Sequence, residues 1–145
     1  MSIKLQLNGF DDLFEQIKAA GGTVDQAANS CMKQSAQIMQ NELKSQMQKS
    51  GVDSGLINRM PQPQLDVDGN VYIARVGYKK GAYTPGDLSD GYKVVFLNYG
   101  TPHRSKHGKI PEKGFIQRAK KKARPQIKKA QKATLEKILG RLKRK

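Results

Sequence analysis

The feature that most constrains the fold of this chain is a long apolar stripe at helical spacing between residues 23 and 49. Residues three or four apart share one face of an α-helix, so the stripe predicts one long helix. Thr23 and Gln26 have the spacing of a capping box at its start, and Gly51 is placed to end it. We expect the stripe to be core or a subunit interface, with a promiscuous binding groove as the alternative for a methionine-rich face. It consists of Ala28, Met32, Ala36, Met39, Leu43 and Met47, with Cys31 and Ile38 beside it.

The first residues of the chain predict a strand followed by a short helix. Ile3, Leu5 and Leu7 alternate with polar residues, which is the period of a half-buried strand. Apolar residues then recur at helical spacing over residues 10–17, before a Gly-Gly step. The pattern leaves open whether the strand joins the main sheet or pairs with a neighbouring subunit.

Residues 65–99 predict the rest of the sheet. Residues 65–78 have the pattern of a hairpin that turns at Asp68-Gly69-Asn70. Residues 92–99 are apolar on both faces, which predicts a central strand. The segments 51–64, 79–91 and 100–113 contain glycine and proline and lack periodicity, so they are predicted to be loops.

From Gly114 onward the chain again has a helical pattern. Pro125 either kinks this helix or restarts it, because its ring blocks a hydrogen bond to the preceding turn. The residues from Arg141 onward are expected to fray. The predicted apolar edge consists of Phe115, Ile116, Ala119, Ala123, Ile127, Ala130, Thr134, Ile138 and Leu142.

These elements predict an α+β fold, with a small antiparallel sheet packed against a long helix and a basic C-terminal helix. The 145 residues fit a single domain, 1–145, in two sections. Section 1–98 is a charge-neutral body of helix and sheet, with ten Lys/Arg and ten Asp/Glu. Section 99–145 is a basic loop and helix with seventeen Lys/Arg and two Glu, so it holds the whole net charge of +15.

Charge this concentrated attracts polyanions, because their counterions are released on binding. A solvated, solubilising tail is the alternative interpretation. The section contains no recognised DNA-reading module, so any contact with nucleic acid would be to the backbone, without sequence preference. The residues expected to form a basic surface that faces a polyanion or a partner are Arg104, Lys106, Lys109, Lys113, Arg118, Lys120, Lys121, Lys122, Arg124, Lys128, Lys129 and Lys132.

The sequence shows no catalytic or cofactor motif. Cys31 is the only cysteine, which rules out an internal disulfide framework and a Cys-pair zinc motif, and we expect it to be a buried thiol. His103 and His107 lie in a predicted loop without further ligands. Asp66 and Asp68 would point the same way on a strand, as in a metal-nuclease pair, but Asp is common before a turn. We therefore expect neither enzymatic activity nor a metal or other cofactor.

The chain also lacks the sequence features of a membrane protein. No apolar run approaches the roughly 20 residues that a membrane-spanning helix needs. The N-terminus lacks the apolar run of a signal peptide. We expect a soluble protein made in a reducing cytoplasm, with no membrane partner.

A pattern in the second half of the chain resembles a known family. The pattern consists of Phe96-Leu97-Asn98-Tyr99-Gly100-Thr101, Pro111, Gly114-Phe115-Ile116 and Arg118-Ala119. It resembles the head–tail neck, or tail completion, family of siphoviruses (the gene-product-ten-like family). Members carry an aromatic-Gly-Thr step, a loop with proline and basic residues, and a Pro-Phe-Leu-Arg-Pro-Ala step that opens the last helix. The positions that match in this chain are Tyr99, Gly100, Thr101, Pro111, Phe115 and Ala119.

The match extends over nearly the whole chain but includes departures. Ser54-Gly55-Leu56 occupies the place of a Thr/Ser-Gly-x-Leu step upstream. Gly114 stands where the family usually has proline, and Gln117-Arg118 replaces Arg-Pro. Asn98 replaces the usual acidic residue before the aromatic, and the following loop is longer than in most members.

The resemblance implies a non-enzymatic structural component of the head–tail connection of a bacteriophage or prophage. It would form part of the ring that joins the capsid connector to the tail and lets DNA pass. Its partners would be further copies of itself, other phage connector and tail proteins, and genomic DNA as a candidate. It would be located in the host bacterial cytoplasm during assembly and then in the virion neck or tail. A stand-alone, non-sequence-specific nucleic-acid-binding protein is the alternative.

Overall fold

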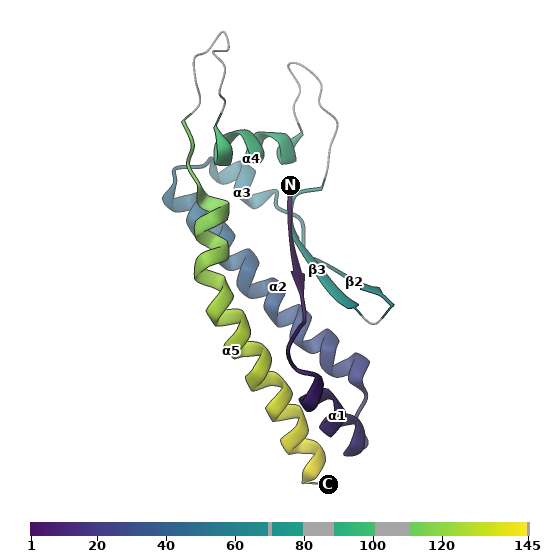
Figure 1. Cartoon of the computed structure of the whole chain (residues 1–145). Coiled ribbons are helices and arrows are strands. Elements are labelled where there is room, and N and C mark those ends of the chain that lie inside the picture. The colour runs from purple at the N-terminus through teal and green to yellow at the C-terminus, as the bar shows by residue number, and fades with distance from the viewer. Residues whose placement is uncertain (70, 80–88, 101–110, 145) are drawn as a thin grey trace.

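The computed structural model describes residues 1–69, 71–79, 89–100 and 111–144 of the chain. Two long helices, α2 (Val24–Lys49) and α5 (Phe115–Lys143), run antiparallel along the length of the molecule (Figure 1). The short helix α1 (Asp11–Ala19) lies at one end of this pair, and α3 (Ser54–Asn58) and α4 (Asp90–Tyr99) lie at the other. A three-stranded antiparallel sheet packs on α2. The predicted α+β fold is confirmed.

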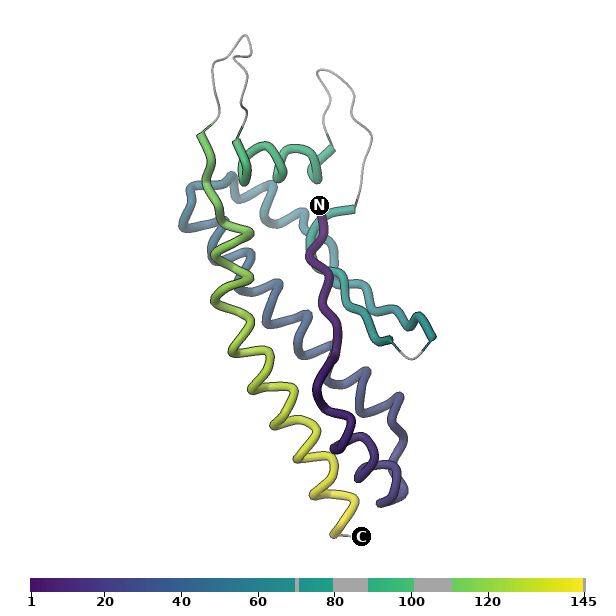
Figure 2. Tube along the Cα trace, viewed as in Figure 1, coloured from purple at the N-terminus to yellow at the C-terminus, as the bar shows by residue number. Residues whose placement is uncertain are grey.

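The sheet consists of β1 (Ser2–Gln6), β2 (Gln64–Asp68) and β3 (Val71–Gly77), in the order β1-β3-β2. The predicted hairpin is confirmed, with Asp68 opposite Val71 at its turn. The N-terminal strand joins the sheet, where Ile3 lies opposite Val76 and Leu5 opposite Ala74. Figure 2 shows β1 running between α5 and the hairpin.

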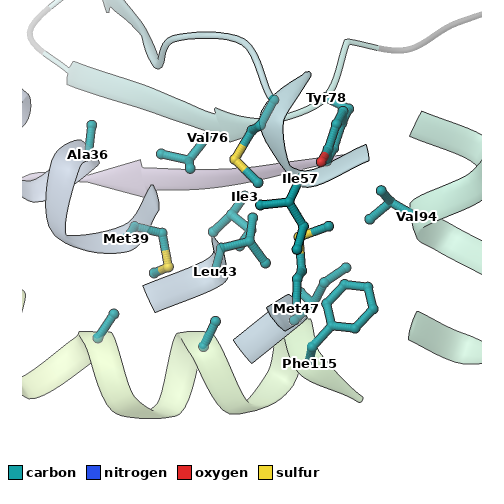
Figure 3. Packing of buried hydrophobic residues seen from close by; sticks show 14 of the residues in the cluster. Ile3, Ala36, Met39, Leu43, Met47, Ile57, Val76, Tyr78, Val94 and Phe115 are labelled. Carbon is teal, nitrogen blue, oxygen red and sulfur yellow. The ribbon is translucent and has the colours of Figure 1, made fainter. Parts of the chain in front are cut away.

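The apolar stripe of α2 is the centre of the molecule. All six of its residues are buried, with exposed fractions of 3% or less. Met39, Leu43 and Met47 meet Val76 from the sheet and Phe115 from α5 in the main core (Figure 3). A smaller cluster joins α1, α2 and α5 at the other end, around Ile17, Cys31 and Leu135. The stripe is therefore core, as expected, and not an open groove.

Residues 92–99 form part of helix α4, so the predicted central strand is wrong. A short run that is apolar on both faces fits a partly covered helix as well as a buried strand. Val94 and Asn98, four residues apart, are fully buried, whereas Phe96 is half-buried. Asp90 in the first turn of α4 accepts a hydrogen bond from Arg59 at 2.9 Å, in a place where helices favour acidic residues.

Two local predictions around α2 and α3 need correction. Thr23 is the N-cap of α2, but its side chain makes no capping hydrogen bond, so the predicted capping box is wrong. The predicted loop at 51–64 contains helix α3, which Asp53 caps by accepting a hydrogen bond from the Leu56 N–H at 3.3 Å. Gly51 follows the end of α2 with a φ of +77°, as predicted for a helix-ending glycine.

Helix α5 also differs from its predicted form. It continues through Pro125 without restarting and reaches Lys143, so the expected fraying from Arg141 is wrong. Its first buried residues are those predicted, as far as Ile127. Beyond this point the buried positions are Gln131, Leu135 and Leu139, each one residue after the predicted Ala130, Thr134 and Ile138. An apolar pattern could not point to Gln131, because this buried side chain is polar.

Candidate interaction surface on helix α5 and strand β1

Helix α5 presents a broad positive surface. Its 29 residues include eleven Lys/Arg and one Glu. None of the exposed cations below forms an ion pair with a carboxylate in the described part of the chain. The predicted residues that lie exposed on α5 with neither a carboxylate partner nor a side-chain hydrogen bond to the end of α2 are Lys120, Lys121, Lys122, Arg124, Lys128, Lys129 and Lys132.

These cations divide into two sets, according to whether they line a groove beside α5. Lys120, Arg124 and Lys128 are four residues apart, so they share one side of the helix. This side borders a groove of about 460 Å³ between α5 and β1. Lys4 of β1 also lines the groove. Apolar side chains from β1, α2 and α5 form its base. The other four exposed lysines do not line this groove, and we refer to them as the outer side of α5: Lys121, Lys122, Lys129 and Lys132.

Two other predicted basic residues bind the end of α2. The Lys113 ammonium donates to the Ser50 carbonyl at 3.1 Å. The Arg118 guanidinium donates to the Ser50 hydroxyl at 2.6 Å and to Gln46 Oε1 at 3.3 Å. Cations stabilise a helix C-terminus, where the backbone dipole is negative. Lys113 and Arg118 therefore join α5 to α2. Arg104, Lys106 and Lys109 lie outside the described residues.

The described residues that carry the family resemblance lie near the end of α4 and the beginning of α5. Phe115 and Ala119 are fully buried in the main core. Gly100 ends α4 with a φ of +76°, while Tyr99 is 55% exposed. Pro111 is exposed, and Thr101 lies outside the described residues.

Asn98 connects these two helices, and sequence reasoning missed this role. Its side-chain Oδ1 accepts a hydrogen bond from the Ile116 N–H at 2.8 Å. Its backbone carbonyl accepts from the N–H groups of Lys113 at 3.2 Å and Gly114 at 3.0 Å. The first N–H groups of a helix lack partners within the helix, so Asn98 caps α5 from a distance in the chain. A search for local capping motifs could not find a cap that lies on another helix.

A buried polar contact also ties α2 to α5. The Gln131 amide donates to the Ser35 hydroxyl at 2.9 Å, and Ser35 donates to the Cys31 carbonyl at 2.7 Å. The Cys31 thiol lies 3.7 Å from the Gln131 carbonyl oxygen, to which it donates. Burial raises the pKa of Cys31 to about 11, which keeps the thiol protonated at neutral pH. The expected buried thiol is confirmed.

The described residues offer no arrangement for metal chemistry. Among them, no group of three His, Cys, Asp or Glu side chains is placed to hold a metal ion. Asp66 accepts hydrogen bonds from the Val67 N–H at 2.9 Å and from Arg75 at 3.5 Å, so its carboxylate has local partners. His103 and His107 lie outside the described residues.

None of the helices in the described ranges is both long and apolar enough to cross a membrane. Comparison of the chain with protein-family models, curated proteins and solved structures gives no significant match.

Proposed function

We propose that this chain is a structural component of the head–tail connection of a bacteriophage or prophage. In this role it forms part of the ring that joins the capsid connector to the tail and lets DNA pass. The observation that carries the proposal is the joint between α4 and α5. Gly100, Phe115 and Ala119, which match the pattern of the neck family, act there as helix end and core, and Asn98, at a position where the family usually has an acidic residue, caps α5.

The surface of the molecule is compatible with a subunit of a ring. A closed ring of identical subunits needs two different faces on each copy. Strands β1 and β2 occupy opposite edges of the sheet, and they differ in charge and surroundings. The outer cations of α5 provide attraction to a polyanion without base recognition, which would let DNA slide through the ring.

A stand-alone nucleic-acid-binding protein remains the second candidate, because the exposed cations of α5 support it equally. The salt dependence of DNA binding does not distinguish this candidate from the ring subunit, since both could bind DNA through its phosphates. Self-association does, because a ring subunit needs it and a stand-alone binding protein does not.

The direct test is an amber mutation in the gene within the phage or inducible prophage that carries it. Electron microscopy of the resulting particles is expected to show separate full heads and tails, or tails with an unfinished upper end. Supplying the unmutated protein from a plasmid should restore joined particles. Joined, infectious virions without the protein would contradict the proposal and favour the nucleic-acid-binding alternative.

A further inference from the structure

Strands β1 and β2 form the two edges of the sheet. Within the described residues, β1 and β2 each have a neighbouring strand on one side only. At the start of β1, the Tyr78 N–H donates to the Met1 carbonyl at 2.6 Å and the Met1 amine donates back to the Tyr78 carbonyl at 3.3 Å. Such reciprocal pairs alternate along an antiparallel ladder. The backbone N–H and C=O groups of Ser2, Lys4 and Gln6 therefore point away from β3, toward the open edge.

This open edge of β1 forms one wall of the groove beside α5. Four successive residues of β1, 3–6, line the groove. A groove over one face of a strand would be lined by alternate residues, so this one follows the strand's edge. Its base contains Ile3, Met39 and Ile127, and Arg124 and Lys128 stand on the α5 side. The groove thus combines free backbone groups, an apolar base and positive charge.

The open edge of β2 has the complementary composition. All five of its residues are exposed, including Leu65 at 36% and Val67 at 50%. Leu65 lies opposite the buried Ala74 of β3, so it shares the face of the sheet that covers α2. A space of about 510 Å³ beside β2 and α2 nevertheless leaves Leu65 and Val67 open. Asp66 and Asp68 lie on the opposite face of the strand.

A strand that paired with β1 would lie above α5, because α2 lies under the sheet and α5 packs beside α2. If that strand were β2, its Leu65 and Val67 would cover the apolar base of the groove. Asp66 would come to the same face as Lys4, where opposite charges on paired strands stabilise each other. Unpaired edges are templates for such strand addition between chains.

We propose that the groove between β1 and α5 binds the β2 edge of a second copy of this chain. The sheets of neighbouring copies then join edge to edge. Each copy binds one neighbour through its β1 edge and the other neighbour through its β2 edge. Such a contact is heterologous, so repetition around an axis closes a ring. The inference deepens the proposed ring-forming role and rests on it for the choice of a second copy as the occupant.

The test is chemical cross-linking between two single-cysteine forms of the full chain in a Cys31→Ser background. One form carries Lys4→Cys, and the other carries Asp66→Cys with a tag that changes its mass. A short bismaleimide is added at about 1 mM protein, the order of concentration that a scaffold would provide locally. The expected product is the mixed dimer, with no dimer from either form alone. A Lys121→Cys form, exposed on the outer side of α5, is the matched control and should not link to Asp66→Cys.

Exchanging the charges of Lys4 and Asp66 provides a second measurement, which needs no cross-linker. Lys4→Asp or Asp66→Lys alone is expected to lower the association constant in sedimentation about fivefold. The double variant should restore it. No mixed dimer, or dimers within one form only, would overturn the inference, as would a double variant no better than the singles. Joined virions from the amber mutant would contradict the proposed function instead, and would leave a mixed cross-link standing.

Discussion

Helices α2 and α5 have similar lengths and lie side by side, but they are covered to different extents. In α2, 11 of 26 residues are buried, because the sheet packs on one side and α5 on another. In α5, 8 of 29 are buried, and β1 leaves a groove beside it. The charges differ in the same sense: α2 has three Lys and two acidic residues, whereas α5 has eleven Lys/Arg and one Glu.

The difference indicates which helix holds the fold together and which is available to partners. A residue of α2 that points inward meets the sheet or α5, so its loss disrupts several elements at once. A residue on the outer side of α5 meets solvent, so its loss leaves packing unchanged. The predictions that follow test this division through the free energy of unfolding, from the largest change to the smallest.

The largest loss is expected for Leu43→Ala, in the middle of α2. Leu43 is fully buried in the main core, so its truncation leaves a cavity between the helix and its neighbours. We expect the free energy of unfolding in urea to fall by about 3 kcal/mol. The matched change on α5, Lys129→Ala, should cost less than about 0.5 kcal/mol. Equal losses in the two variants would contradict the division between the helices.

A smaller loss is expected for Asn98→Ala, which removes the cap of α5. The Ile116 N–H would lose its 2.8 Å acceptor in a buried setting. The cost should be about 1–2 kcal/mol, measured by urea unfolding. Tyr99→Ala is the control, because this neighbouring side chain is largely exposed. If Asn98→Ala cost no more than Tyr99→Ala, the cap across the two helices would not stabilise the protein.

The contrast between α2 and α5 also explains which parts of the fold could be predicted from the sequence. The stripe of α2 was predictable because each of its six residues is apolar and obeys one period. The second half of α5 was not, because the buried Gln131 is polar and its hydrogen-bond partner Ser35 lies 96 positions away, which leaves no local signal. Residues 92–99 were misassigned because a short apolar run does not distinguish a helix from a strand.

The interaction surface was predictable in part. The charge of the last third was evident from residue counts, and eight of the twelve basic residues expected to form the surface lie exposed on α5. Sequence could not separate Lys113 and Arg118 from the others, because only the fold brings these two against the end of α2. The groove also required the fold, since it forms between residues far apart in the chain.

A third prediction concerns the contact between the helices at Cys31. Burial raises the pKa of this thiol to about 11, from its usual 9.0. The unfolded chain releases the proton first, so the free energy of unfolding begins to fall as the pH approaches 9 and continues to fall toward pH 11. At pH 9.5 the loss should be less than about 1 kcal/mol. Cys31→Ala, which cannot ionise, should show a weaker decline in urea unfolding over the same range; an identical decline would contradict this assignment.

The smallest effect on stability is expected on the outer side of α5. Changing Lys121, Lys122 and Lys129 to Gln should alter the free energy of unfolding by less than about 0.5 kcal/mol. Binding to duplex DNA should respond instead, because each lost phosphate contact lowers the slope of log K against log salt by about 0.9. We expect the slope to fall by up to about 2.7, as measured by fluorescence anisotropy at several salt concentrations.

The matched control removes the same charge from the neutral body, with Lys18, Lys33 and Lys49 changed to Gln. These lysines are exposed but lie on α1 and α2, so the slope should stay close to that of the unchanged protein. An equal fall in both triple variants would mean that net charge attracts DNA and that the outer side of α5 has no special part in binding. A fall in the slope for the first variant alone would place the polyanion contact on α5, and α2 would keep its role as the helix that stabilises the fold.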